Sequence, residues 1–158
     1  MRRFLALATV GMATLAFIAS AASAAPPEKV VFFDSFTFAD TWTCPGITIV
    51  QSNEERDTVI EFSATKLHIQ RHGLATLTAN GKTLTSNFSA MILIDLETEL
   101  VKVVGTVYNI QVPGAGNVLL DAGNVVFDDS TGSVVRVAGP HQQLTGDVGA
   151  LCSYLTAP

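Results

Sequence analysis

The apolar run NVLLDAGNVVF, residues 117 to 127, contains a single carboxylate, Asp121. If this run is a β-strand, alternate residues share a face, and both faces around Asp121 are mostly apolar. A carboxyl group buried in such surroundings has a raised pKa unless a partner compensates it, and enclosed acids of this kind serve as general acids or bases. Asp121 is therefore the first candidate for catalysis. The first interpretation of Asp121 is nevertheless a structural carboxylate, paired or near a rim, and catalysis or ligand orientation is the alternative.

Arg136, on the following predicted strand, is the candidate partner that decides between these roles. If the turn DSTG, residues 129 to 132, closes as a two- or four-residue loop, Val125 lies opposite Arg136 and the arginine shares the face of Asp121. If Gly132 forms a three-residue turn with a bulge, the register slips by one and Arg136 points to the other face. The sequence leaves both registers open.

Two histidines are further candidates for proton transfer. His141 follows the apparent exit of the last strand, where it is either a ligand or proton-transfer group near neutral pH or an ordinary surface residue. His72 ends the predicted strand KLHIQRH, four residues after His68. Four strand residues span about 13 Å, so the two histidines cannot bind one metal ion, and their row is either a solvated face or a cavity lining. We expect neither a metal nor a cofactor.

Aromatic residues are the candidates for an apolar binding site. Several of them gather near the start of the predicted mature chain, where they form either core or the lining of a ligand pocket. This group comprises Phe32, Phe33, Phe36, Phe38 and Trp42. The candidate ligand-binding residues along the whole chain are Phe33, Trp42, Tyr108, Phe127 and Arg136.

The elements that would position these residues are β-strands. Most segments alternate apolar and polar residues or form short apolar runs rich in β-branched residues, separated by turn signals. This pattern predicts an all-β protein with eight or nine antiparallel strands in meander order, closed into a barrel. Asn80-Gly81 predicts a two-residue type I′ hairpin, DSTG and PGAG (residues 113 to 116) predict further turns, and NEERD (residues 53 to 57) predicts a solvated turn.

The end of the chain changes to helical spacing. Leu144, Val148, Leu151 and Leu155 fall on one side of a helix, with Thr145 available as its N-cap. We expect this short C-terminal helix to pack on the barrel.

The two cysteines, Cys44 and Cys152, are expected to form a disulfide that ties the helix to the start of the domain. The bond would close a loop of about 107 residues and stabilise the fold by about 4 to 5 kcal/mol on the chain-entropy model.

The N-terminus predicts export. Arg2 and Arg3, an apolar stretch and Ala22-Ser23-Ala24 form a signal peptide over residues 1–24, leaving residues 25–158 as a single β-barrel domain. Without the two arginines, seven basic residues face 14 acidic ones, a net charge of about −7, which disfavours nucleic acid as a partner. We expect a secreted, extracellular or cell-envelope protein, a monomer or weak dimer, with no stable membrane insertion after cleavage.

The segment VPGAGNVLLDAG resembles the GGTG and A-x-G stretch of the dirigent and allene oxide cyclase barrels, through Gly114, Gly116, Ala122 and Gly123. The resemblance implies a closed eight-stranded barrel with an apolar cavity, a small hydrophobic ligand, and cyclisation or stereocontrol as the chemistry. The chain is also similar to small secreted bacterial proteins of uncharacterised function that share a TCPG-like cysteine, a VLLDAG strand and a closing AGPH…LC segment. That likeness implies localisation and fold.

Three functions are consistent with these residues. The leading expectation is non-catalytic binding of a small apolar molecule inside or at the mouth of the barrel. The second is an isomerase or cyclase in which Asp121 is the acid or base and His141 or His72 assists. The third is a cell-envelope interaction protein that uses its outer surface. A cavity containing an unpaired Asp121 favours the second function, an apolar cavity with Asp121 tied to an arginine favours the first, and a filled barrel favours the third.

Overall fold

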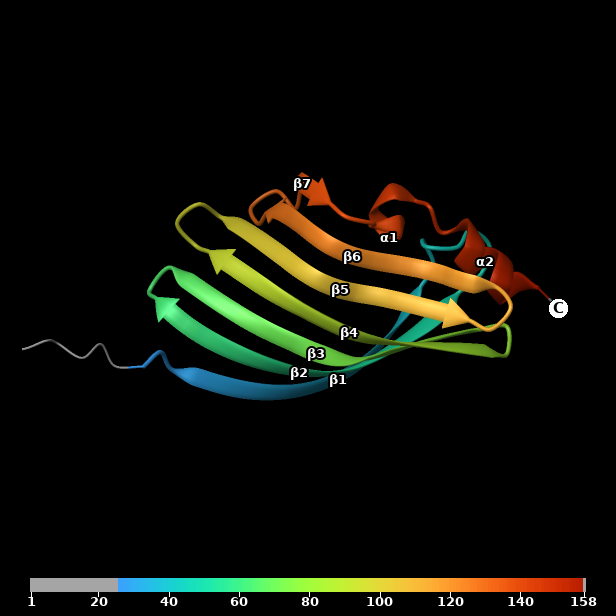
Figure 1. Ribbon diagram of the computed structural model, residues 1–158, viewed down its shortest axis with the longest axis horizontal. Helices are drawn as coiled ribbons and strands as arrows, with labels where there is room; N and C mark the ends of the chain where they lie inside the picture. Colours follow the sequence, from blue (N-terminus) through green and yellow to red (C-terminus); the bar gives the residue numbers. More distant parts are fainter. Residues whose placement is uncertain (1–25, 158) are drawn as a thin grey trace, which may run out of the picture.

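The computed structural model describes residues 26–157, so the predicted signal peptide lies outside the described residues. One antiparallel sheet contains seven strands, each paired with its neighbours in sequence, and two short helices follow it (Figure 1). In chain order the elements are β1 (Lys29–Asp40), β2 (Ile49–Ser63), β3 (Lys66–Ala79), β4 (Lys82–Asp95), β5 (Leu100–Val112), β6 (Gly116–Asp128), β7 (Val134–Ala138), α1 (Gln142–Thr145) and α2 (Gly149–Thr156).

The predicted all-β meander with a C-terminal helix is confirmed, but the described chain has seven strands where the sequence predicted eight or nine. Two pairs of predicted strands are each one continuous strand. Residues 53–57, expected to be a solvated turn, lie within β2 and pair with both β1 and β3. Gly73 likewise continues β3, opposite Glu55 and Phe88. The polar and glycine signals were misleading because ladder hydrogen bonds on both sides hold these residues in strand conformation.

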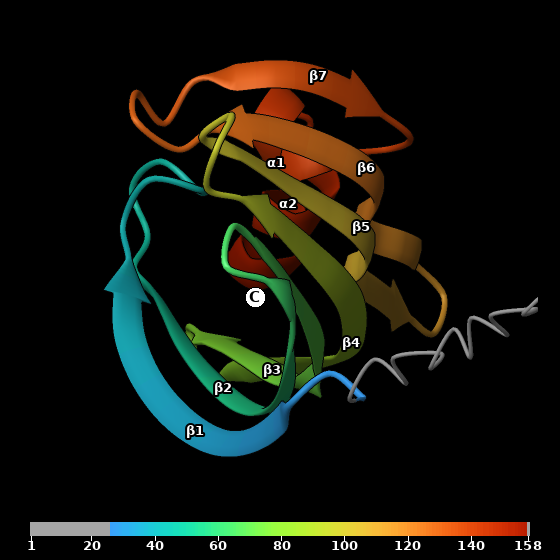
Figure 2. The ribbon, with the colours of Figure 1, turned by 90° about the vertical axis from the view of Figure 1, so that its left-hand side faces the viewer.

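The sheet curls strongly, but closure into a barrel is not seen within residues 26–157. β1 pairs with β2 and β7 pairs with β6, and the two outer strands exchange no hydrogen bonds with each other. Figure 2 shows β1 and β7 at opposite ends of the arc, with the helices inside the curve. A barrel requires its first and last strands to pair. The described fold is therefore a curved sheet with one concave and one convex face.

The predicted hairpin at Asn80-Gly81 is confirmed. Both residues have positive φ, 50° and 75°, and Ala79 lies opposite Lys82 across the turn. This is the geometry that a type I′ turn requires and that Asn-Gly adopts at little cost. The hairpin also holds α2, because the Asn80 Nδ2 donates to the Leu155 carbonyl oxygen at 3.1 Å and the Lys82 Nζ donates to the Tyr154 carbonyl oxygen at 2.7 Å.

The buried core occupies one end of the concave face, where α2 covers the strands. We call this end the plugged half. Its apolar residues come from the strands, from the loop after β1 and from α2, and they are Cys44, Ile49, Ala75, Leu77, Ala79, Leu84, Tyr108, Ile110, Val118, Leu119, Leu151 and Leu155. No helix among the described residues is long and apolar enough to cross a membrane.

The predicted disulfide between Cys44 and Cys152 is confirmed, with Cα atoms 5.4 Å apart. The helix itself begins later than the sequence predicted. Gly146 adopts a left-handed conformation with φ of 74° and ends α1, so α2 starts at Gly149. Thr145 is therefore the last residue of α1 and does not cap α2; its Oγ1 donates instead to the His141 carbonyl oxygen at 3.0 Å.

Candidate functional site

Paired glycines create a hollow on the concave face beyond the core. Gly105 of β5 lies opposite Gly123 of β6, with φ of 137° and 128°. A Cβ atom on Gly123 would lie 2.2 Å from the Ala138 carbonyl oxygen, and one on Gly105 would lie 2.3 Å from the Ser89 carbonyl oxygen. Glycine is thus required here both by the backbone conformation and by the close approach of the next strand.

The bare sheet surface at these glycines is part of a pocket of about 240 Å³, which we call the glycine pocket. Most of its lining is apolar, and its polar groups gather where β6 meets the segment after β7. The lining residues are Val103, Gly105, Val107, Asp121, Gly123, Val125, Phe127, His141, Gln143 and Leu144.

Asp121 lies in this pocket and is only 4% exposed. Its Oδ1 accepts a hydrogen bond from the Gln143 backbone N–H at 3.3 Å. Its Oδ2 is buried and has no hydrogen-bond partner within residues 26–157. Burial raises the pKa of the Asp121 carboxyl, while the Gln143 hydrogen bond and nearby His141 act in the opposite direction. Asp121 therefore has one buried oxygen without a partner among the described residues and a raised tendency to hold a proton.

His141 lies beside this carboxyl. The two residues form a β-bridge, and the His141 Nδ1 is 3.9 Å from the Asp121 Oδ1. The other ring nitrogen, Nε2, lies 3.3 Å from the Ala138 carbonyl oxygen. When Nε2 carries the proton and donates to that carbonyl, Nδ1 presents its lone pair toward Asp121. A carboxyl and an imidazole are groups that acid–base chemistry uses, and here their nearest atoms lie just beyond hydrogen-bond distance.

A second pocket, of about 220 Å³, adjoins the glycine pocket and shares Val103 and Val107 with it. We call it the tyrosine pocket because Tyr108 lines it, and we call the two pockets together the open half of the concave face. The remaining lining residues are Asn53, Glu55, Arg71, Ala75, Phe88, Ala90 and Ile92. The Tyr108 hydroxyl accepts a hydrogen bond from the Gln51 Nε2, and burial raises the pKa of Tyr108, so the phenol stays protonated at neutral pH.

The charged groups at the far side of the tyrosine pocket are paired, with one guanidinium between two carboxylates. The Arg71 Nη2 lies 2.6 Å from the Asp57 Oδ2 and 3.3 Å from the Glu55 Oε1, and the Arg71 Nε donates to the Asp57 Oδ1 at 2.9 Å. The hydrogen bond to Asp57 raises the pKa of Arg71. Because this bidentate pair is satisfied internally, the tyrosine pocket offers mainly apolar surface to a ligand.

The structure brings four of the sequence-selected residues to the open half. Asp121, His141 and Phe127 line the glycine pocket, and Tyr108 lines the tyrosine pocket. The three catalytic candidates are not together, however. His72 is exposed on β3 and faces the convex side of the sheet, opposite to Arg71 and the tyrosine pocket.

Phe33 and Trp42 lie outside the open half. Phe33 is 78% exposed on β1, at the edge of the sheet, and Trp42 is 71% exposed in the loop that follows. Trp42 stacks on Phe38 with ring centroids 6.2 Å apart. These aromatic side chains therefore neither fill the core nor line the glycine pocket, because β1 is an outer strand with no neighbour on its free side among the described residues.

Arg136 does not pair with Asp121. Asp128 and Ser133 hydrogen-bond across a four-residue loop, but a bulge at Val135 then shifts the register, so Arg136 lies opposite Val126 and Val137 lies opposite Val125. Arg136 consequently points to the convex face. Of the two registers that the sequence left open, the structure has the one that separates Arg136 from Asp121, but the bulge is at Val135 inside β7 and not at Gly132 in the turn, where it was considered.

Sequence reasoning missed several residues of the site. Val103, Val107 and Gln143 were not selected, since an apolar strand residue and a loop amide carry no chemical signal of their own. Gly105 did carry one, because glycine inside a strand pattern often marks a bulge or close approach of backbones. Within residues 26–157, no group of three histidine, cysteine or acidic side chains is arranged to hold a metal ion.

Comparison of the chain with protein-family models, with curated proteins and with solved structures found no match.

Proposed function

We propose that this protein binds a small, mainly apolar molecule in the open half of its concave face, with a hydrogen-bond donor of that molecule directed at Asp121. The observation that carries the proposal is the pair of adjoining pockets, about 240 and 220 Å³, which share Val103 and Val107. Small-molecule sites are typically concave and apolar with a few polar groups that fix orientation. Here that polar group is the Asp121 Oδ2, which has no partner among the described residues.

A second candidate function is proton transfer to or from the bound molecule, as in an isomerase or cyclase. The observation that favours it is the environment of Asp121, whose pKa is raised by burial and whose Oδ1 lies 3.9 Å from the His141 Nδ1. A carboxyl group with a raised pKa is closer to the pH at which general acids and bases are most effective. Binding is the first proposal because it needs only the pocket, whereas catalysis also needs a reactive substrate.

The test of binding is a fluorescence titration with Nile red, a neutral apolar dye, combined with a variant that fills the open half. Val103→Trp places a large side chain where the two pockets meet. We expect it to weaken dye binding at least about tenfold, because removal or blockage of a buried apolar contact of this size is worth about 1.4 kcal/mol or more.

Val104→Trp is the matched control. Val104 is the next residue on β5, is exposed, and lies on the convex face. This variant adds the same aromatic surface without occupying either pocket, so its affinity for the dye is expected to match that of the wild type. Equal dye affinity for Val103→Trp and wild-type protein would show that the dye binds elsewhere, for example along the exposed aromatic residues of β1, and would overturn the proposal.

Native mass spectrometry of the unreduced protein addresses the natural ligand and the choice between binding and catalysis. A co-purified molecule that returns unchanged supports binding, while conversion of that molecule by wild-type protein but not by Asp121→Asn supports catalysis. The resemblance to the dirigent and allene oxide cyclase barrels supports this second candidate function, since cyclisation is acid–base chemistry on a small hydrophobic molecule.

We further propose that the protein acts outside the cytoplasm, as a monomer or weak dimer. The disulfide between Cys44 and Cys152 supports this location, because such bonds persist in oxidising compartments. The predicted signal peptide is the second support.

A further inference from the structure

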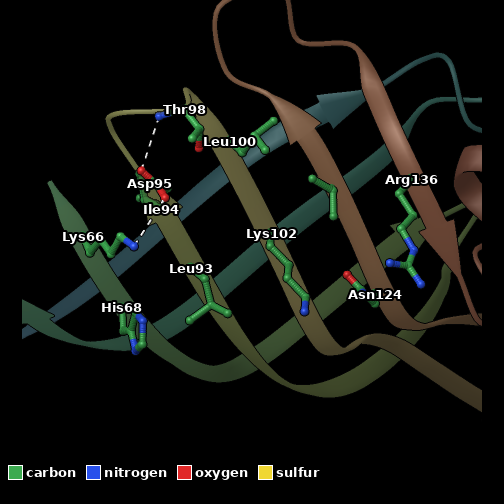
Figure 3. A pocket seen from close by; sticks show the side chains of 11 residues that line it. Lys66, His68, Leu93, Ile94, Asp95, Thr98, Leu100, Lys102, Asn124 and Arg136 are labelled. Carbon is green, nitrogen blue, oxygen red and sulfur yellow. Dashed lines mark hydrogen bonds and ion pairs between the residues drawn. The ribbon is translucent and has the colours of Figure 1, made fainter. Parts of the chain in front are cut away.

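We propose that the convex face carries a separate site, which binds an oxyanion group of a small molecule through Lys102, Asn124 and Arg136 (Figure 3). This site lies in a pocket of about 360 Å³, which we call the cation pocket. It is on the opposite side of the sheet from the glycine pocket and is independent of the proposed function. Its lining residues are Lys66, His68, Leu93, Ile94, Asp95, Thr98, Leu100, Lys102, Asn124, Val126 and Arg136.

The strand register places the three donors together. Lys102 of β5 lies opposite Val126 of β6, and Val126 lies opposite Arg136 of β7, so the two cations share one row across the sheet. Their backbones are two strand spacings apart, about 10 Å. Asn124, two residues before Val126, shares its face. In Figure 3 the side chains of Lys102 and Arg136 both extend toward Asn124, which lies between them.

None of these donors is used by the rest of the described chain. Within residues 26–157, Lys102 and Arg136 form neither an ion pair nor a side-chain hydrogen bond. The Asn124 Oδ1 is buried without a partner, and no hydrogen bond from its Nδ2 is found within the same residues. A guanidinium, an ammonium and an amide N–H are the donors that bind carboxylate and phosphate oxygens in proteins.

The other charged groups of the cation pocket are already engaged at its far side. The Lys66 Nζ lies 3.8 Å from the Asp95 Oδ2, and the Asp95 Oδ1 accepts hydrogen bonds from the backbone N–H groups of Glu97 and Thr98. The His68 ring packs at a tilt of 44° against Phe62, with ring centroids 4.1 Å apart. Asp95 is the one acid among the lining residues, and it is paired. An anion beside Asn124 would therefore meet cations without a competing free carboxylate in the pocket.

The clustering of basic residues in this pocket contrasts with the negative charge of the whole chain. The formal net charge is −5, yet three basic residues line this one pocket. A local positive potential in an acidic protein attracts anions to that position and repels them elsewhere. Leu93, Leu100 and Val126 add apolar surface beside the donors. The ligand class is therefore a small molecule that combines a carboxylate or phosphate group with an apolar body.

The test is a pair of NMR titrations of the ¹⁵N-labelled protein, one with inorganic phosphate and one with octanoate. We expect saturable shifts of the signals of Lys102, Asn124 and Arg136. Tighter binding of octanoate at these signals supports an amphiphilic carboxylate, and binding of phosphate alone supports a free or esterified phosphate. If neither anion moves these signals, or if octanoate moves only signals of the concave face such as Val103 and Val107, the proposal is overturned.

Two double variants separate this site from general charge effects. Lys102→Gln with Arg136→Gln removes the two proposed ligands, and Lys29→Gln with Arg56→Gln removes the same charges from exposed positions on β1 and β2. We expect at least about tenfold weaker anion binding in the first and less than about twofold change in the second, since a hydrogen bond to a charged group is typically worth a factor of ten or more. Equal weakening in both would overturn the proposal.

Asn124→Asp, which places a carboxylate of nearly the same shape between the two cations, is expected to abolish binding.

Discussion

The plugged and open halves of the concave face are built from the same strands but are covered differently. In the plugged half, Leu151 and Leu155 of α2 are fully buried against apolar strand residues, and the disulfide holds the helix in place. In the open half, α1 borders the surface through Gln143 and Leu144 but does not fill it, and pockets remain around Val103 and Val107. One sheet therefore combines a core that stabilises the fold with a surface that is left available for a ligand.

This comparison assigns stability to one half and binding to the other. Residues such as Leu119 and Asp121 are only two positions apart on the same face of β6, yet one belongs to the core and the other lines the glycine pocket. If the assignment is correct, substitutions in the plugged half lower the free energy of unfolding, while substitutions in the open half change binding with little loss of stability.

The largest expected effect comes from removing the disulfide of the plugged half. Cys44→Ser with Cys152→Ser should lower the free energy of unfolding by about 4 to 5 kcal/mol, because the unfolded chain gains the entropy of opening a loop of about 107 residues. Urea unfolding of the wild type and of the variant measures the difference. Under conditions where the variant is still folded, its affinity for Nile red should be unchanged. A loss of less than about 1 kcal/mol would contradict this role of the bond.

The next largest effect is expected when the same substitution, leucine to alanine, is made in each half and the loss of stability is compared. Leu151→Ala removes a fully buried side chain from the plugged half and should cost about 2 to 5 kcal/mol, through lost burial and the cavity left behind. Leu144→Ala removes a side chain that is 48% exposed and lines the glycine pocket, and should cost less than about 1 kcal/mol. Thermal or urea unfolding of both variants tests the comparison, and similar losses in the two would show that the halves are not distinct.

The smallest expected effect concerns the pH dependence of stability due to Asp121. Its pKa is raised in the folded protein, so the folded state holds the proton more tightly than the unfolded state does. The resulting stabilisation is complete below the unfolded pKa of about 3.9 and is lost as the pH rises through the folded pKa. The Asp121→Asn side chain has no proton to lose, so the variant does not lose stability in this way as the pH rises. It should therefore have a higher free energy of unfolding than the wild type at pH 7.

Unfolding measured in urea from pH 3 to pH 8 checks the sign. The difference in stability between Asp121→Asn and wild type should increase in favour of the variant as the pH rises and then level off. A difference that changes in the other direction would mean that the carboxylate is favoured in the folded state, and would contradict the assignment of Asp121 to an apolar pocket.

Local signals in the sequence were sufficient for much of the fold. The alternation of apolar residues predicted antiparallel strands, Asn80-Gly81 predicted its turn, and the two cysteines predicted their bond, because each feature depends on neighbouring residues or on a simple count. The burial of Asp121 also followed from its apolar neighbours. These are the features for which short-range physical chemistry decides the outcome.

Features that depend on distant pairing could not be predicted in the same way. Residues 53–57 are polar and would suit a turn, but pairing with β1 and β3 keeps them in a strand. The bulge at Val135, which turns Arg136 away from Asp121, depends on how β7 fits β6. Likewise, the lack of pairing between β1 and β7 is a property of the whole sheet. Sequence reasoning therefore found the acid of the site but not its surroundings.

The position of the disulfide also determines the order in which the fold can be completed. Cys44 precedes β2 and Cys152 lies in α2, so the bond encloses six of the seven strands and cannot form until residue 152 has been synthesised. Until then the apolar side chains of Ile49, Leu77 and Leu119 have no helix to cover them. A growing chain that already contains β1 to β6 is therefore at its most vulnerable to aggregation, and it becomes protected only when α2 arrives.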